Sequence, residues 1–249
     1  MNSNTMRTVL VVDDVDMNLQ LAQKLLESRG LHVLLASNGK EAISMFNRSK
    51  VDLILMDIQM PEMDGLQATK RIREFSDVPV IALTANISTE ETTTYYSIGM
   101  NDFLAKPIDE RKLFELLSTY IQVDINEPSK KRHSGQEPMY DFKLVEEIAG
   151  GDEEFVRRMM TMFIDTVPGL LTDLQKSIEH GHWEKASKVA HRMKSTIDSM
   201  NIKAIKVEIR QIEANGKQQL NLSEMPALFH KVSSVLTDCI DSVRNELAL

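Results

Sequence analysis

Five short apolar runs, each separated from the next by an amphipathic stretch, dominate the first half of the chain. The runs are rich in Val, Ile and Leu: TVLVV (8–12), LHVLLA (31–36), VDLILM (51–56), PVIAL (79–83) and DFLA (102–105). Apolar runs of this length are typical of strands buried on both faces of a parallel sheet. Between them, apolar residues recur at helical spacing, as in Leu113, Leu116 and Leu117. Residues 1–122 are therefore predicted to form a doubly wound α/β domain with a five-stranded parallel sheet.

This alternation stops in the middle of the chain. Segment 123–139 contains two prolines, a glycine and a basic run, a composition typical of a solvated linker. Residues 140–249 have no strand-like run, so an all-α domain is expected there. The spacing predicts helices near 141–149, 152–180, 183–200, 203–215 and 223–247. We expect a kink at Pro168-Gly169 and helix ends at Gly181 and at Asn215-Gly216.

The charge, the cysteine content and the hydropathy of the chain exclude several classes of protein. The chain has 29 Lys and Arg against 37 Asp and Glu, which gives a formal net charge of −8. A protein that binds phosphate backbones needs a basic face, so nucleic acid is not an expected partner. A single cysteine, Cys239, excludes a disulfide scaffold and favours a reducing compartment. No window reaches the roughly 18 apolar residues of a membrane span, so we expect no membrane insertion and a cytoplasmic location.

Residues with chemical capacity follow four of the five predicted strands. They are Asp13 and Asp14, Asp57, Thr84 and Lys106, and ligands of open parallel sheets bind at the carboxyl ends of the strands. Converging carboxylates repel one another unless a cation lies among them, and hard oxygen ligands suit Mg²⁺. A lysine and a hydroxyl beside that metal would bind phosphoryl oxygens. A carboxylate in such a site can be the nucleophile and form an aspartyl-phosphate.

Similarity to a known family is carried by four motifs: VVDD (11–14), MDIQMPEMDG (56–65), LTA (83–85) and FLAKP (103–107). In this order they resemble the receiver domain of two-component response regulators, over residues 7–121. The resemblance implies the flavodoxin-like form of the doubly wound fold, with Asp57 as the phospho-acceptor. It also implies that Asp14 binds Mg²⁺ directly, that Asp13 binds it through a water, and that the Gln59 carbonyl is a further ligand beside Asp57.

The same resemblance implies roles for the remaining residues of the site. Thr84 would follow the phosphoryl group and Lys106 would pair with it. The peptide bond between Lys106 and Pro107 is expected to be cis, an isomer that is essentially restricted to proline. Phe103 occupies the position of the family's switch aromatic. Because Phe103 has no hydroxyl, only a steric coupling of its rotamer to Thr84 is expected.

Among the six histidines, His191 is distinguished by its helix. Apolar residues form one stripe at helical spacing: Ala186, Val189, Ala190, Met193, Ile197 and Met200. His191 points roughly 150° away from the centre of that stripe, so its imidazole is expected to be exposed. Its neighbours on that face are Ser187, Lys188, Lys194 and Ser195. Small side chains and flanking ammonium groups suit phosphoryl exchange, but an ordinary solvated face contains the same residues, so spacing alone leaves both interpretations open.

The segment AHRMKS, which contains His191, is similar to the histidine-containing phosphotransfer (Hpt) domain, whose pattern is a histidine followed three residues later by lysine and then by glycine. The similarity extends over about 141–248 and implies a four-helix bundle. It implies that His191 accepts phosphate on Nε2 and that Lys194 assists electrostatically. Two residues depart from the family pattern. Ser195 stands where the family usually has glycine, and Asn201 replaces a usual glycine at the helix end, where Asn tolerates the left-handed conformation next best.

These features predict an intermediate of a multistep phosphorelay. A sensor histidine kinase would supply the phosphoryl group to Asp57 with Mg²⁺, and His191 would exchange it with the same or another receiver domain. The expected partners are therefore a sensor histidine kinase and other receiver or Hpt domains. No GxGxxG or GxxxxGK[ST] motif occurs, so we expect a phosphotransfer intermediate without an ATP-dependent kinase domain. Two alternatives stay open. One is a phosphorylation-gated binding module in which the helical domain only docks a partner; the other is a phosphatase that uses the DxD spacing of Asp14 and Asp16.

Overall fold

The computed structural model describes residues 6–85, 89–123 and 140–248. The chain divides into two compact units, residues 1–133 and 134–249. Apart from Val123, the predicted linker 123–139 lies outside the described residues. Each unit is therefore considered by itself.

All five predicted strands are present and form one parallel sheet. They are β1 (Thr8–Val12), β2 (His32–Ala36), β3 (Leu53–Asp57), β4 (Val80–Thr84) and β5 (Asp102–Ala105). Their order is β2-β1-β3-β4-β5, which is the flavodoxin-like arrangement that the resemblance implies. The direction of winding reverses between β1 and β3, where Val12 lies opposite Met56. The residues that follow these two strands therefore lie side by side at the carboxyl edge of the sheet.

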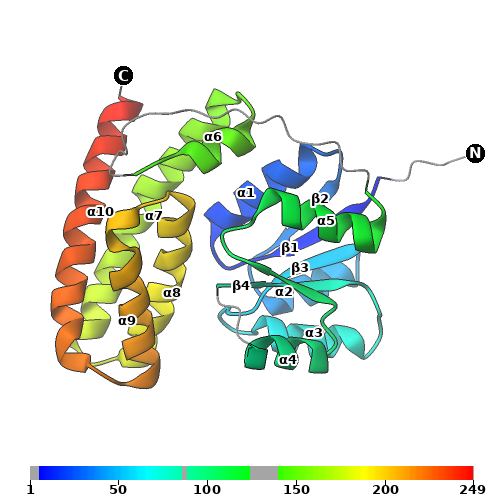
Figure 1. Cartoon of the computed structure of the whole chain (residues 1–249), viewed down its shortest axis with the longest axis horizontal. Helices are drawn as coiled ribbons and strands as arrows, with labels where there is room; N and C mark the ends of the chain where they lie inside the picture. The colour runs from blue at the N-terminus through cyan, green and yellow to red at the C-terminus, as the bar shows by residue number, and fades with distance from the viewer. Residues whose placement is uncertain (1–5, 86–88, 124–139, 249) are drawn as a thin grey trace, which may run out of the picture. The chain divides into compact units, whose positions relative to one another are not determined.

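Helices cover both faces of this sheet (Figure 1). One face is covered by α1 (Asp16–Glu27) and α5 (Glu110–Ile121), and the other by α2 (Gly39–Phe46), α3 (Gly65–Arg73) and α4 (Thr89–Ser97). Three of these helices begin with a side chain that accepts hydrogen bonds from free backbone N–H groups: Asn38 at α2, Asp64 at α3 and Asp109 at α5. Under α2, α3 and α4, alternate residues of the strands form one apolar core that includes Leu10, Ile54 and Ala82.

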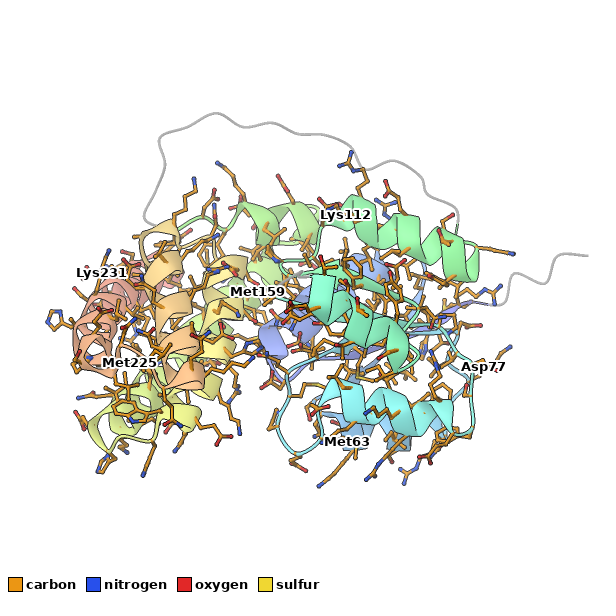
Figure 2. The ribbon with its side chains drawn as sticks, turned by 60° about the horizontal axis from the view of Figure 1, so that its bottom comes forward. Met63, Asp77, Lys112, Met159, Met225 and Lys231 are labelled. Atoms are coloured by element: carbon orange, nitrogen blue, oxygen red, sulfur yellow. The ribbon has the colours of Figure 1, made fainter. Side chains whose placement is uncertain are left out.

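The second unit is a helical bundle, as the resemblance implies. Its helices are α6 (Lys143–Ala149), α7 (Glu153–Glu179), α8 (Trp183–Ser199), α9 (Lys206–Gln218) and α10 (Met225–Leu247), with 3₁₀ turns at Lys203–Ile205 and Leu222–Glu224. The four longer helices pack in a ring, α7 on α8, α8 on α9, α9 on α10 and α10 on α7. Met159 and Met225 are two of the fully buried side chains that fill the interior (Figure 2). None of the helices in the described ranges combines the length and the apolar character that crossing a membrane requires.

One predicted helix end in this unit is wrong. Helix α9 continues through Asn215 and Gly216 to Gln218, and the residue that caps it, Gln219, has a left-handed φ of 54°. A Cβ on Gly216 would lie 2.7 Å from the carbonyl oxygen of Trp183 and 3.1 Å from Cβ of Ser187. The glycine therefore permits close packing of α9 on α8 and does not terminate the helix.

The other helix-breaking residues of this unit are Gly181, Asn201 and Pro168. Gly181 has a φ of 68° and separates α7 from α8, which confirms the predicted helix end. Asn201 follows α8 with a φ of 47°, so it adopts the left-handed conformation for which glycine is usual. Pro168 lies inside α7, which continues from Glu153 to Glu179 as one helix, and the kink expected at Pro168-Gly169 stays a prediction.

Candidate functional site

Three carboxylates meet at the carboxyl edge of the sheet in the first unit. Asp57 is the last residue of β3, and Asp13 and Asp14 follow β1 directly. Each offers one ligand oxygen, and these oxygens lie within 4.8 Å of one another. Asp13 and Asp57 are buried and Asp14 is half-buried. The order of the parallel strands thus brings together the three acids that the sequence places at strand ends.

Lys106 links two of these acids. Its Nζ lies 2.6 Å from Oδ2 of Asp13 and 2.7 Å from Oδ2 of Asp57. Burial by itself lowers the pKa of the Lys106 ammonium, but the charges and hydrogen bonds of the two carboxylates more than offset it, and the pKa lies above its ordinary value. The Lys106-Pro107 peptide bond is cis, as the resemblance implies. Lys106 is therefore charged throughout the physiological pH range.

Backbone and amide donors fix the orientation of the two buried carboxylates. Oδ1 of Asp13 accepts hydrogen bonds from the backbone N–H of Val15 and from Nδ2 of Asn18, both at 3.0 Å. Oδ1 of Asp57 accepts one from the backbone N–H of Gln59 at 3.2 Å. The Gln59 backbone therefore lies beside Asp57, and its carbonyl stays a predicted metal ligand.

The loop from β3 to α3 positions Asp57 through Gly65. The N–H of Gly65 donates to the carbonyl oxygen of Ile58 at 3.1 Å. A Cβ at Gly65 would lie 2.0 Å from the carbonyl oxygen of Asp57, a distance that no side chain tolerates. Met63, in the same loop, is buried (Figure 2). Only glycine permits α3 to begin this close to Asp57.

Thr84, the last residue of β4, is buried beside the same edge of the sheet. In the β3–β4 pairing Asp57 lies opposite Leu83, so Thr84 follows one residue beyond. Its Oγ1 lies 3.2 Å from the hydroxyl of Tyr95 on α4. Sequence reasoning did not identify Tyr95, which lies in a helix with little apolar periodicity.

Phe103, the predicted switch aromatic, is on β5 opposite Ala82. It is partly buried against the core under α4. Its ring meets that of Tyr96 edge-on, with the centroids 6.4 Å apart. The steric coupling of its rotamer to Thr84 stays a prediction.

The donor set of this cluster fits a hard divalent cation. Three carboxylates each offer an oxygen here, and Lys106 pairs with two of them. Carboxylate oxygens and a backbone carbonyl are ligands of the kind that Mg²⁺ prefers, and Mg²⁺ keeps several waters in such sites. The arrangement is therefore an acidic cluster suited to Mg²⁺.

In the second unit, His191 belongs to a network centred on one carboxylate. Nδ1 of His191 lies 2.6 Å from Oε1 of Glu213, and Nζ of Lys194 lies 2.5 Å from Oε2 of the same carboxylate. The hydroxyl of Ser187 donates to the backbone carbonyl of Glu213 at 2.8 Å. Burial raises the pKa of the Glu213 carboxyl, but the hydrogen bonds from His191 and Lys194 lower it to about 2.

The predicted exposure of the His191 ring is wrong. His191 is 8% exposed, and Ser187, Lys194 and Ser195 on the same face are also buried. The exposure of His191 was predicted from the apolar stripe of α8 alone. Helix α9 also packs along α8 and covers part of its polar side. Nε2 of His191 is buried and has no hydrogen-bond partner among the described residues. Lys188, the other predicted neighbour, pairs with Glu184 on the exposed side of the helix.

Glu213 is a functional candidate that sequence reasoning missed. The buried face of α9 is defined by Ile209, Ile212 and Gly216. Glu213 lies four residues after Ile209 and three before Gly216, so it belongs to that face. A carboxylate on the apolar face of an amphipathic helix is the signal that could have revealed it, because buried charges are generally paired.

The chain is similar to known proteins over both units. Residues 9–118 match the family model of the response regulator receiver domain, and residues 158–246 match that of the Hpt domain. The signal transduction histidine-protein kinase BarA of Escherichia coli K12 is 29% identical over 252 residues, which cover 96% of this chain and 27% of BarA. The aerobic respiration control sensor protein ArcB of the same strain is 27% identical over 249 residues, covering 96% of this chain and 31% of ArcB. The chain thus spans less than a third of the length of these two relatives.

Solved structures resemble the first unit. The receiver domain of the sensor histidine kinase PA1611 from Pseudomonas aeruginosa PAO1, which has a magnesium ion coordinated in its active-site cleft, is 36% identical to this chain. The similarity covers 47% of this chain and 98% of that domain, with a TM-score of 0.44. From the two family matches, we conclude that the chain belongs to the response regulator receiver family over residues 9–118 and to the Hpt domain family over residues 158–246.

Proposed function

We propose that this protein is an intermediate of a phosphorelay, in which Asp57 and His191 each carry a phosphoryl group in turn. The observation that carries the proposal is the cluster of Asp13, Asp57 and Lys106, because two buried acids that share one lysine form a site for an incoming phosphoryl group. Both units belong to families of phosphorelay domains, which supports the same function.

At the receiver site, a carboxylate oxygen of Asp57 attacks the phosphorus of a phosphohistidine on a partner. The oxygen–phosphorus bond forms as the nitrogen–phosphorus bond breaks, and the departing imidazole takes up a proton from solvent. Lys106 and the hydroxyl of Thr84 bind phosphoryl oxygens, and Lys106 neutralises their charge. Asp13, Asp14, Asp57 and the Gln59 carbonyl would hold Mg²⁺, which supplies positive charge to the phosphoryl oxygens when bound.

At the Hpt site, Glu213 determines which ring nitrogen of His191 reacts. Glu213 is ionised at neutral pH because its pKa is about 2, so its carboxylate accepts a hydrogen bond from a protonated Nδ1. The lone pair then resides on Nε2, which becomes the nucleophile. Lys194 places a positive charge next to the phosphorylated ring. Nε2 is buried in this structure, so exchange requires that it become accessible when a receiver domain docks.

The proposed partners follow from this exchange. A sensor histidine kinase supplies the phosphoryl group to Asp57 from a phosphohistidine, and His191 exchanges the group with Asp57 and with other receiver or Hpt domains. We place the receiver domain at residues 1–122, the linker at 123–139 and the Hpt domain at 140–249. The cytoplasm is the compartment in which such partners and Mg²⁺ would meet this chain.

The proposal is tested with phosphoramidate as a small-molecule donor. The full chain, Asp57→Ala and His191→Ala are incubated with the donor and Mg²⁺, and intact-mass spectra report phosphoryl groups. Acyl phosphates are hydrolysed in base, whereas phosphohistidine is stable in base and is cleaved by acid, so the two products are distinguishable. We expect each variant to lose one product, and EDTA to remove the base-sensitive one. Undiminished labelling of both variants would contradict the proposal.

A further inference from the structure

Tyr95 connects helix α4 to the phosphoryl site. Its hydroxyl lies 3.2 Å from Oγ1 of Thr84, and the two residues are 4% and 6% exposed. All nine residues of α4 are described, and Tyr95 is the one that is buried. Its ring lies in the apolar core under α2, α3 and α4. A hydroxyl buried in such a core needs a hydrogen-bond partner, and Thr84 provides it.

The ionisation of Tyr95 favours a donor role. Burial raises the pKa of the phenol, the hydrogen bond with Thr84 lowers it, and the charges of Glu91 and Asp57 raise it further. The net change is upward from an ordinary value of about 10, so the hydroxyl keeps its proton throughout the neutral range.

Threonine has a single hydroxyl proton. When Thr84 donates that proton to a phosphoryl oxygen, its oxygen can only accept hydrogen bonds from its other neighbours. Tyr95 can donate to it, which leaves the threonine proton directed at the phosphoryl group. Two hydroxyls in series also polarise each other and strengthen the terminal hydrogen bond.

We propose that Tyr95 is a positioning residue for phosphorylation of Asp57: its hydroxyl donates to Oγ1 of Thr84 and directs the threonine proton to the phosphoryl group. No covalent bond changes in this step. The inference rests on the proposed function of Asp57. Phe103, at the predicted switch position on β5, has no hydroxyl. In this proposal the hydroxyl that contacts Thr84 comes from Tyr95 on α4 instead.

The test uses beryllofluoride, which mimics a phosphoryl group on a carboxylate. Binding to the full chain with Mg²⁺ is measured by fluorine NMR for the wild type, Tyr95→Phe, Thr84→Val and the double variant. We expect Tyr95→Phe to weaken the affinity about 2- to 10-fold, the effect of one net hydrogen bond. In the Thr84→Val background the same substitution should have no further effect, because Tyr95 acts through Thr84.

Tyr96→Phe is the matched control, because it removes a hydroxyl from the adjacent, 51% exposed tyrosine. This control should bind beryllofluoride as the wild type does. The inference is overturned if Tyr95→Phe binds as tightly as or more tightly than the wild type, or if its effect persists undiminished in the Thr84→Val background. A wild-type chain that binds no beryllofluoride, or binds it equally after Asp57→Ala, would instead overturn the proposed function.

Discussion

Lys106 is the residue on which the acidic cluster depends. It is the cation that Asp13 and Asp57 share, at 2.6 and 2.7 Å, in a nearly buried setting. Burying a carboxylate without a partner is costly, and removal of one member of a buried ion pair typically costs about 3–5 kcal/mol. The cluster is therefore stable only with a cation present, either this ammonium or a metal.

We expect Lys106→Met to lower the free energy of unfolding of the receiver domain by about 3 kcal/mol in EDTA. Millimolar Mg²⁺ should restore part of this loss, because it neutralises the same carboxylates. Urea unfolding of the full chain, followed by circular dichroism with and without Mg²⁺, measures both effects. Lys112→Met on the exposed side of α5 (Figure 2) is the control and should change stability by less than about 0.5 kcal/mol. Equal stability of wild type and Lys106→Met in EDTA would refute this role.

Glu213 makes the stability of the Hpt domain depend on pH. Its pKa in the folded state, about 2, is below the value of about 4.3 expected in an unfolded chain. A depressed pKa means that the carboxylate stabilises the fold above about pH 4.3 and loses this effect as the pH falls toward 2. Glu213→Gln should therefore be less stable by about 2 kcal/mol at neutral pH, after allowance for partial solvent screening.

The test is urea unfolding of wild type and Glu213→Gln from neutral pH to about pH 3. Fluorescence of Trp183, the single tryptophan, reports the Hpt domain. The two stability curves should converge as the pH falls below about 4.3. A gap of constant size across this range would show that the Glu213 charge does not stabilise the fold.

At the level of elements, α9 shows what periodicity can and cannot predict. The existence of the helix follows from its apolar spacing, but its end does not. Glycine occurs both at helix ends and at points where two helices pack closely, and the spacing does not distinguish these roles. A glycine after the last apolar residue commonly ends a helix. Gly216 instead lies where α9 meets the backbone of Trp183 and the side chain of Ser187. That contact comes from α8, which no local pattern in α9 reveals.

We expect Gly216→Ala to destabilise the Hpt domain by about 1–3 kcal/mol, because its methyl group would overpack the α8–α9 contact. Gly169→Ala in α7 is the matched control, since a Cβ there meets nothing within 4 Å. Alanine at that position should leave stability unchanged or raise it by up to about 1 kcal/mol, from its higher helix propensity. Trp183 fluorescence in urea measures both, and equal effects of the two substitutions would disprove the packing role.

For the whole molecule, the fold could be predicted from the sequence more completely than the residues that surround each reactive group. Parallel strands align their carboxyl ends, so Asp13, Asp57 and Lys106 could be placed together from strand order alone. The partners of His191 could not be predicted in this way, because Glu213 contacts it from another helix. The burial of the His191 ring could not be predicted either, because it depends on more than the apolar stripe of α8. Tyr95 was missed for the same reason, since its partner Thr84 is on a strand.

The central claim is that Asp57 and His191 trade one phosphoryl group. The direct measurement loads His191 of an Asp57→Asn chain with phosphoramidate and mixes it, free of donor, with a heavy-isotope-labelled His191→Gln chain. With Mg²⁺, intact-mass spectra should show the phosphoryl group leaving the light chain and appearing on Asp57 of the heavy chain, and EDTA should prevent this. A heavy chain that stays unphosphorylated with Mg²⁺ present, while the light chain keeps its phosphoryl group or loses it to water, would contradict the account.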